Sequence, residues 1–332
     1  DKPSIAVLPF ANMSDDPEQE YFSDGITEEI ITALSKTPKL FVIARTSSFK
    51  YKGKEADVRT VGRELGVRYV MEGSVRKADD TVRITAQLVD AKTGNHVWAE
   101  RYDRDLKDIF ALQDEITMKI IEALQVSLTK GEQARITAKG TKNLDAYLMC
   151  LQGAEQLKRW NKDGLIRGRK MVEKAIGLDP KYAEAHCMLA WSYWFEVPLV
   201  LTKNPRQSIA RAMELAQKAL ALDESLAYAH SLMGYMYILQ RQYDEGIAEC
   251  EQAVSLEPNS ARAHYFLGLV LKYAGRHKEA ITVSKEAIRL NPIPPSNYYQ
   301  ALTNAYCLTG QYKQAITTGR KAVRIEPNNL AA

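Results

Sequence analysis

One short stretch has the residue types and the setting of an active-site loop. An apolar segment that reads as a buried strand, Ile5–Phe10, is followed by a polar loop and then by the sequence YFSDGITEEI, Tyr21–Ile30. A serine, an aspartate and a glycine at the start of a helix are where many α/β proteins bind a phosphate or place a nucleophile. The stretch therefore raises the question of phosphoryl-transfer or acyl-transfer chemistry.

The spacing of these residues fits neither chemistry. A phosphate loop needs several glycines and a lysine, as in GxxxxGK[ST], but the stretch has only Gly25 and the next lysine is Lys36. A nucleophile elbow needs GxSxG, and Ser23 has neither glycine. The carboxylate of Asp24 near a helix start would repel a phosphate. We therefore predict that Ser23 or Asp24 caps the helix, with an anion or substrate site as the alternative.

Other polar groups also lack the pattern of a catalytic or metal site. The acidic run Ser14–Glu20 lacks the DxDxDG order of a calcium loop and reads as a solvated loop. Four cysteines lie far apart without a CxxC pair, which favours buried apolar side chains over zinc or disulfides. They are Cys150, Cys187, Cys250 and Cys307. We predict no catalytic residue, no metal and no cofactor in this chain, and leave open whether a longer protein is an enzyme.

Three of the five histidines recur at one position of a repeated segment. His186, His230 and His264 each stand fourth in a helix that begins with alanine. Helices that pack together are about 8–10 Å apart, and each repeat adds two helices, so the three imidazoles cannot share one metal. We expect each to fill the place of an aromatic residue between two helices. A ladder that senses protons is the alternative.

Composition bounds the remaining function classes. The chain has 332 residues, of which 45% are apolar and 26% are charged, and its net charge of +4 is too small to indicate nucleic-acid binding. No run of about 18 apolar residues is present, so we expect no membrane contact by this region. The sequence starts at Asp1 without a signal peptide, which suggests a piece of a longer protein, and the compartment stays open between bacterial cytoplasm and periplasm.

An internal period of 34 residues organises the second half. Gly234 and Gly268 are 34 residues apart, and so are Pro258 and Pro292. Small residues recur where two helices must touch, and a proline recurs where each second helix must stop. This pattern is strongly similar to tetratricopeptide (TPR) repeats. The resemblance implies an all-α TPR superhelical solenoid at 146–332 with about five repeats: 146–182, 183–226, 227–260, 261–295 and 296–329.

The first half mixes strands and helices. Alternation along Val82–Asp90 predicts a strand with one buried and one wet face. The other expected strands are Ile5–Phe10, Leu40–Arg45, Tyr69–Lys77 and Val97–Asp103, and the expected helices are Ile26–Lys36, Asp57–Leu65 and Ile109–Leu128. Together they predict an α/β domain at 1–129 with a mixed sheet in the order βαβαβββα. A polar linker follows at 130–145.

This order, with the stretches SIAVLPFANMSDDPEQEYFSDGITEEI and YVMEGSVRKADDTVRITAQLVDAKTG, resembles the N-terminal domain of TolB and its relatives over residues 3–128. The resemblance implies a bacterial protein. In such proteins this domain, followed by TPR repeats, often lies downstream of a class III adenylate or guanylate cyclase domain. It also occurs downstream of a winged-helix DNA-binding domain.

The TPR resemblance also implies where a partner binds. The concave surface of such a solenoid is lined by the first helix of each repeat and commonly binds a peptide or a folded protein. Four positions of that helix point to the partner in this family. Here they are Trp191, Trp194, Tyr228, Ser231, Tyr235, Arg262, Tyr265, Lys272, Asn297, Gln300 and Asn304. Asparagine stands at the ninth position only at Asn304, which makes a free carboxylate ligand doubtful.

An insertion of about ten residues interrupts the period between Val197 and Arg206. We expect a loop or an extra turn there, and its apolar start makes it a candidate contact in a homodimer.

The sequence leaves three candidate functions. The first is a sensor and scaffold region of a signalling protein, most simply a nucleotide cyclase. The second is a TolB-like envelope scaffold or the regulatory part of a winged-helix regulator, and the third is an enzyme in its own right.

Overall fold

The computed structural model of the chain describes residues 2–137 and 140–327. Contacts group the chain into two compact units: Asp1–Thr137 with Glu257–Ala332, and Ala138–Leu256. The predicted fold class is confirmed, because a small mixed-sheet domain is followed along the chain by paired, TPR-like helices. The predicted domain boundaries stay a prediction, and the two compact units divide the chain differently. Two residues of the predicted linker, 138–139, lie outside the described residues.

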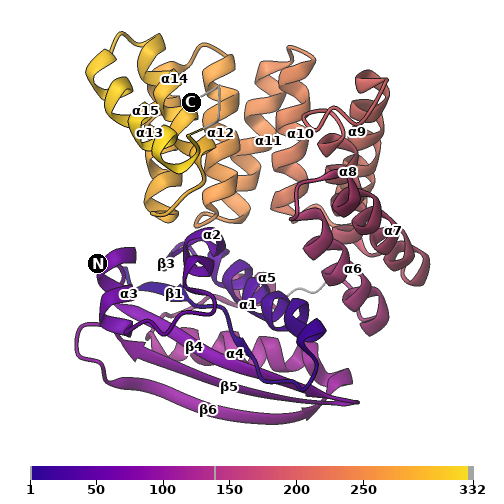
Figure 1. Cartoon of the computed structure of the whole chain (residues 1–332), viewed down its shortest axis with the longest axis vertical. Helices are drawn as coiled ribbons and strands as arrows, with labels where there is room; N and C mark the ends of the chain where they lie inside the picture. Colours follow the sequence, from indigo (N-terminus) through magenta and orange to yellow (C-terminus); the bar gives the residue numbers. More distant parts are fainter. Residues whose placement is uncertain (1, 138–139, 328–332) are drawn as a thin grey trace. The chain divides into compact units, whose positions relative to one another are not determined.

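Six strands form one mixed sheet in the first unit (Figure 1). Its order is β3-β1-β4-β5-β6, with β2 also paired to β4. The pairs that involve β1, β2 and β3 are parallel, and β4, β5 and β6 are successive antiparallel neighbours. The strands are β1 (Ser4–Val7), β2 (Ala11–Asn12), β3 (Phe41–Val42), β4 (Tyr69–Ala78), β5 (Thr81–Asp90) and β6 (His96–Asp105).

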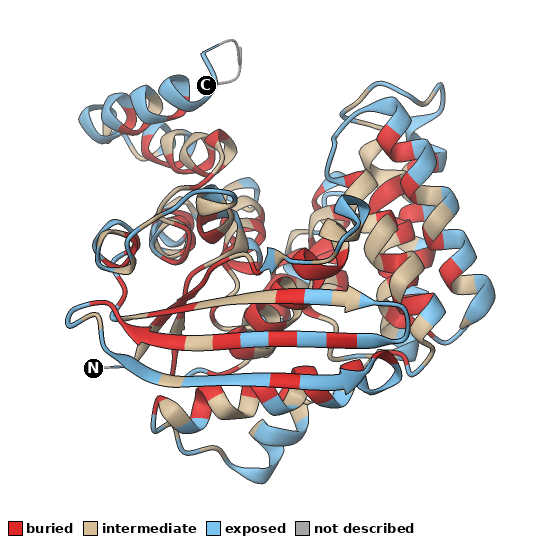
Figure 2. Cartoon of the chain, turned by 60° about the horizontal axis from the view of Figure 1, so that its bottom comes forward, coloured by how far each residue is buried: buried red, intermediate tan, exposed pale blue. Residues whose placement is uncertain are grey.

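Alternating side chains fix the face that each strand buries. Val82, Ile84, Ala86 and Leu88 of β5 are buried, while the residues between them face outward, as the sequence predicts. Figure 2 shows this alternation of buried and exposed residues along the strands. The β4–β5 hairpin closes through Asp79, which has a left-handed φ of 48°. At β5 the sheet therefore buries one face against a helical layer and leaves the other face exposed.

The helices of this domain lie on both sides of the sheet. α1 and α4 contact each other, and α4 also packs on β5 and β6. α3 packs on β4, where Val61 and Leu65 join Ala6 and Val70 in a buried cluster. The helices are α1 (Glu20–Ser35), α2 (Arg45–Ser48), α3 (Val58–Leu65), α4 (Ile109–Ala123) and α5 (Lys130–Ile136).

Several predicted boundaries in this domain are wrong. α1 begins six residues before the expected start at Ile26, and the expected strand Leu40–Arg45 is only the two-residue β3 followed by α2. The expected helix Ile109–Leu128 ends at Ala123. The predicted linker contains α5, which the Thr129–Glu132 capping box starts. α3 agrees with the prediction, because Asp57 caps it and Gly66 ends it.

Ten helices after residue 143 form five antiparallel pairs in the described part of the chain. Small residues occupy the crossings: a Cβ at Gly234 would overlap Cys250, and one at Gly268 would lie 2.7 Å from the Ser284 hydroxyl. The pairs are α6 (Leu144–Leu157) with α7 (Lys162–Leu178), α8 (Ala183–Phe195) with α9 (Pro205–Leu222), α10 (Ala227–Leu239) with α11 (Tyr243–Leu256), α12 (Ala261–Tyr273) with α13 (His277–Leu290), and α14 (Ser296–Leu308) with α15 (Tyr312–Ile325).

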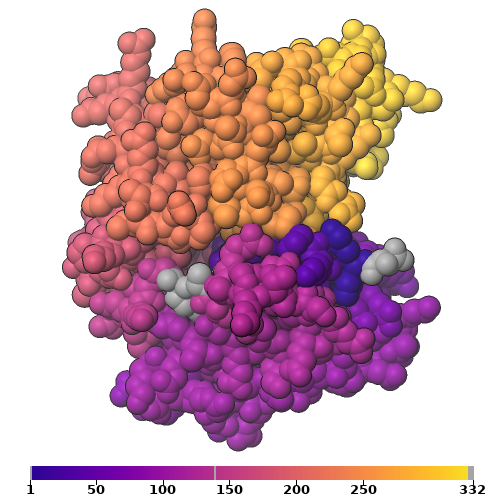
Figure 3. Space-filling view, turned by 180° about the vertical axis from the view of Figure 1, so that it is seen from behind, coloured from indigo at the N-terminus to yellow at the C-terminus, as the bar shows by residue number. Residues whose placement is uncertain are grey.

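The last two pairs contact the α/β domain within the first unit. Ala44 N–H donates to the Leu290 carbonyl at 2.8 Å, and the Ser47 hydroxyl donates to Asn291 Oδ1 at 2.5 Å. Ile293 packs on the apolar cluster under α3. Figure 3 shows the side chains of this part of the repeats, orange to yellow, lying directly on the purple α/β domain. The ends of repeat helices are therefore part of the α/β domain's own packing.

Candidate functional site

The YFSDGITEEI stretch lies within α1 and does not contain its N-cap residue, so the prediction that Ser23 or Asp24 caps the helix is wrong. The N-cap residue is Gln19, which makes no side-chain capping bond. Asp16 instead caps the short 3-10 helix Pro17–Gln19 that leads into α1. The Ser23 hydroxyl is buried and has no hydrogen-bond partner among the described residues.

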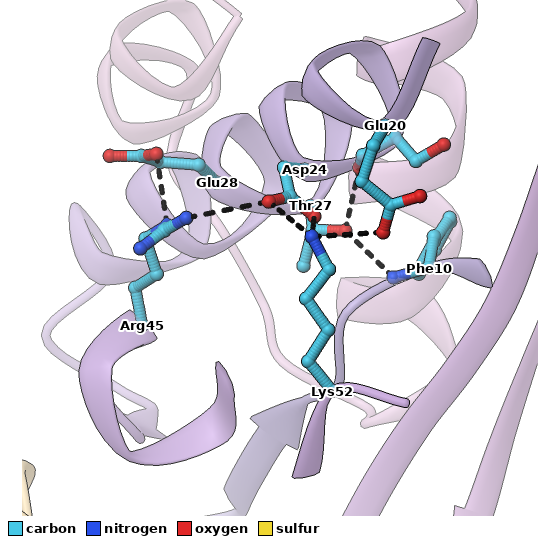
Figure 4. A network of polar contacts seen from close by, with 8 residues as sticks. Phe10, Glu20, Asp24, Thr27, Glu28, Arg45 and Lys52 are labelled. Atoms are coloured by element: carbon cyan, nitrogen blue, oxygen red, sulfur yellow. Dashed lines mark hydrogen bonds and ion pairs between the residues drawn. The ribbon is translucent and has the colours of Figure 1, made fainter. Parts of the chain in front are cut away.

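Asp24 is the centre of a cluster of charges (Figure 4). Its carboxylate is only 5% exposed and accepts two hydrogen bonds of 2.7 Å from Lys52 Nζ. Lys52 also pairs with Glu20 at 2.9 Å, while Arg45 lies 3.8 Å from Asp24 and 3.0 Å from Glu28. Burial would lower the pKa of Lys52, but its hydrogen bonds to Asp24 and Glu20 outweigh that effect and raise it.

This cluster ties α1 to the segment around α2, and neither of its cations is left free for a substrate anion. Beside the cluster, the Thr27 hydroxyl accepts the Phe10 N–H at 3.0 Å and donates to the Ser23 carbonyl at 2.9 Å, which joins α1 to the segment between β1 and β2. Each charged group in the cluster already has an oppositely charged partner. Its geometry is that of a structural ion-pair network around one buried carboxylate, Asp24, whose charged partners are partly exposed.

The three repeated histidines do not act alike. Burial lowers the pKa of His186 and of His264, and each ring binds a carbonyl near the start of its own helix. Burial would also lower the pKa of His230, but its 2.6 Å contact with Glu249 on α11 and its bond to the Glu224 carbonyl raise it. Across residues 2–137 and 140–327, no three His, Cys, Asp or Glu side chains are placed to hold a metal ion.

The cysteine expectation is only partly correct. Cys150, Cys187 and Cys250 are buried, and burial raises the pKa of the Cys250 thiol. Cys307 is exposed on α14.

No helix of the described chain is both long enough and apolar enough to span a bilayer.

In the second unit, the residues predicted to bind a partner form stacked aromatic pairs. The Trp191 and Tyr228 rings stack with centroids 4.6 Å apart, and Trp194 meets Tyr235 edge-on at 5.1 Å. Trp191 is only 4% exposed, and Ser231 is 2% exposed with its hydroxyl bonded to the Ala227 carbonyl. Of the predicted residues on α8 and α10, Trp194, Tyr228 and Tyr235 therefore offer partly exposed aromatic surface.

In the first unit, the predicted residues on α12 and α14 are more polar. Tyr265 stacks on Tyr298 at 4.6 Å, Arg262 and Asn304 are exposed, and Lys272 lies over the neighbouring Tyr273 ring. Two buried side-chain atoms of α14, Asn297 Oδ1 and Gln300 Nε2, have no hydrogen-bond partner in the part of the chain described. Buried polar atoms are normally paired, so these two atoms are exceptions to that rule.

Sequence reasoning missed two parts of the aromatic cluster on α8. Trp160 meets Phe195 edge-on with centroids 4.5 Å apart, and Phe195 also contacts Trp191. Trp160 is 51% exposed and follows the end of α6. The apolar run around Trp191 was a usable signal, but only the fold brings Trp160 beside it. The insertion is a turn and loop as predicted, and Val200 within it is 85% exposed.

Family models match two parts of the chain. The model of the HilA/YgeH-like transcriptional regulator, second domain, matches residues 1–137. The model of the anaphase-promoting complex, cyclosome, subunit 3, matches residues 206–287, within the repeats. The first match covers the α/β domain and α5.

A curated relative is similar over a longer stretch. The Rhizobium meliloti (strain 1021) protein named "Putative adenylate cyclase 3" is 55% identical over 189 residues, which are 57% of this chain and 32% of that protein. The chain therefore spans about a third of the length of the curated relative that it matches.

Solved structures resemble the chain over about half its length. A thermophilic TPR protein of Thermus thermophilus is 19% identical, covers 56% of this chain and 93% of its own, and has a TM-score of 0.45. MamA is 23% identical, with 54% and 97% covered and a TM-score of 0.38. The assignment of the helical pairs as TPR-like rests on the 34-residue period and the hairpins themselves.

Proposed function

We propose that this chain is the non-catalytic sensor and protein-interaction region of a bacterial signalling protein whose catalytic part is an adenylate or guanylate cyclase domain. The observation that carries the proposal is the 55% identity to the Rhizobium protein named as a cyclase. The chain spans about a third of that relative, which leaves ample length there for a separate catalytic domain. The resemblance of the α/β domain to TolB stays a prediction.

The proposed partner surface is the predicted concave face of the repeats. Large aromatic side chains are common anchors of protein interfaces because they bury much area with few rotatable bonds. Trp194, Tyr228 and Tyr235 combine partial exposure with ring contacts that hold them in place. Such preorganised rings favour a peptide or protein ligand that brings its own apolar side chains.

Photo-crosslinking in the native host tests this surface. A photoreactive amino acid at Tyr235 or at Arg262 is expected to capture a partner, whereas the same residue at Glu251, exposed on α11, is the matched control. Adducts confined to the control position would show that the partner uses another face. Trp194→Ala should weaken capture at Tyr235 because it removes the ring that lies against that tyrosine.

Turnover assays test the link to a cyclase. Full-length protein with ATP or GTP and manganese should form the cyclic nucleotide, and the 332-residue chain alone should not. Turnover by this chain alone, abolished by Asp24→Ala, would overturn the proposal. The expectation follows from the ion pairs that occupy Asp24.

A second candidate is the regulatory part of a transcription regulator, which the HilA/YgeH-like match over residues 1–137 favours. The two candidates differ in the rest of the protein. Sequence-specific DNA binding by the full-length protein, without nucleotide turnover, would favour the regulator. In both cases the repeats serve as the partner-binding region.

A further inference from the structure

A groove of about 530 Å³ runs between α13 and α15 in the first unit. Its floor is apolar and aromatic: Tyr299, Leu302 and Tyr306 of α14, with Ile288 of α13. Volumes of this size are typical of sites that bind ligands. The rim of the groove comes from the second helices of the last two repeats, so it is separate from the partner surface proposed above.

Three lysines surround this apolar floor. Lys285 comes from α13, and Lys313 and Lys321 come from α15. Lys285 Nζ lies 5.8 Å from the Tyr306 ring centre and Lys321 Nζ lies 5.6 Å from that of Tyr299. Within the described chain, none of the three ammonium groups forms an ion pair with a carboxylate. The groove therefore has positive charge on its rim that no described carboxylate neutralises.

The preceding repeat shows that this charge is not a general property of these helices. α13 carries Glu279 and Glu286, and each pairs with an arginine on or next to the same helix. α15 begins 35 residues after α13, so the residues of α15 that correspond to Glu279 and Glu286 are Gln314 and Lys321. Between Tyr312 and Ile325, α15 has four basic residues and no acidic one. α15 therefore has a larger excess of basic over acidic residues than α13.

The chemistry of the groove selects its ligand. A positive rim calls for an anion, and a floor of two tyrosines, a leucine and an isoleucine calls for apolar surface beside that anion. The basic groups are lysines, whose ammonium groups are point charges. They lack the planar guanidinium group with which arginine makes bidentate hydrogen bonds to phosphate. We propose that this groove binds an acidic peptide segment of a partner protein, with an apolar side chain on Tyr299 and Leu302 and carboxylates beside the three lysines.

Fluorescence anisotropy with the whole 332-residue chain tests the proposal. The probe is a fluorescein-labelled peptide, Glu-Asp-Glu-Leu-Phe-Glu-Asp-Glu, and binding should weaken several-fold between low and physiological salt. Lys285→Glu/Lys321→Glu should weaken binding at least about tenfold, since two attractions become repulsions. Thr317→Trp should also weaken it by filling the groove without a change of charge.

Matched controls separate this site from general attraction to a basic surface. Lys278→Glu/Arg324→Glu makes the same charge change on the same two helices at exposed residues that do not line the groove, and should alter binding less than about twofold. Equal loss in this control, equal binding of a peptide with Leu-Phe replaced by Ser-Ser, or a dissociation constant above about 1 mM would overturn the proposal. Tighter binding of duplex DNA that the peptide cannot displace would overturn it too.

Discussion

Substitution of Ser47 by alanine should loosen the contact between the α/β domain and the fourth repeat by a measurable amount. Ser47 and Asn291 are both fully buried. The Ser47 hydroxyl donates to Asn291 Oδ1 at 2.5 Å and accepts the Ile293 N–H at 2.8 Å. Ser47→Ala therefore leaves the buried Asn291 acceptor and the partly buried Ile293 N–H without this partner.

The magnitude follows from the cost of unpaired buried groups. Each costs about 1–3 kcal/mol, so Ser47→Ala should destabilise this contact by about 2–4 kcal/mol after partial relaxation. Asn291→Ala should cost about 1–2 kcal/mol plus a small cavity, because the serine can still accept the Ile293 N–H. The double variant should cost less than the sum of the two single changes, since both remove the same hydrogen bond.

Native-state hydrogen exchange of the whole chain measures this effect. In peptides that cover residues 288–298, exchange should speed up about 30- to 700-fold, the free-energy range above converted at about 1.4 kcal/mol per tenfold. Ser231→Ala is the matched control, because that buried serine bonds only to a carbonyl of its own helix. Acceleration below about threefold in Ser47→Ala would refute the claim that this bond holds the repeat against the domain.

Three further predictions concern the second unit. Gly234→Ala should destabilise this unit by about 1–3 kcal/mol in urea unfolding, because the added Cβ would overlap the Cys250 sulfur. Cys250→Ala in the same chain should restore part of the lost stability. Independent, additive effects of the two substitutions would argue against a close contact of α10 and α11 at these residues. Arg241→Gly should raise stability by about 0.5–1 kcal/mol, since Arg241 has a φ of 62° at a turn where the next repeat has glycine, and a lower midpoint would contradict this. The pKa of His230 is raised in the folded state, so its bond to Glu249 should stabilise the fold fully below pH 6.5 and should lose that effect as the pH rises through the raised pKa. His230→Gln should flatten this part of the curve of unfolding free energy against pH. An unchanged curve would refute the role of the pair.

The stretch around Ser23 illustrates where sequence reasoning stopped. Its rejection as a phosphate loop followed from spacing, and the pairing of Asp24 with Lys52 and Arg45 is consistent with it. The capping prediction was wrong, because helix ends depend on which residues the sheet and neighbouring turns cover. Local signals placed the start at the first regular apolar residue, Ile26, but Phe22 is fully buried and belongs to the same helix.

The partner surface shows the same limit at the level of single side chains. The repeat register placed Trp191 and Tyr235 on first helices, and the structure has them there. It could not tell that Trp191 and Ser231 are almost completely covered. It also gave no sign of the lysine groove, because Lys285 and Lys321 are 36 residues apart and come together only when α13 and α15 flank α14.

The sequence by itself determined the features that repeat or alternate over short distances. The 34-residue period and the small residues at the crossings reflect contacts between neighbouring helices, and the alternation in β5 reflects a half-buried sheet. Tertiary structure alone decided which distant segments meet. Residues 257–327 pack with the α/β domain through contacts that include the hydrogen bond between Ser47 and Asn291 and the one from Asn259 to the Thr37 carbonyl. Ser47 and Asn291 are 244 residues apart, and a local pattern reports only contacts between neighbours along the chain, so it cannot reveal that they meet.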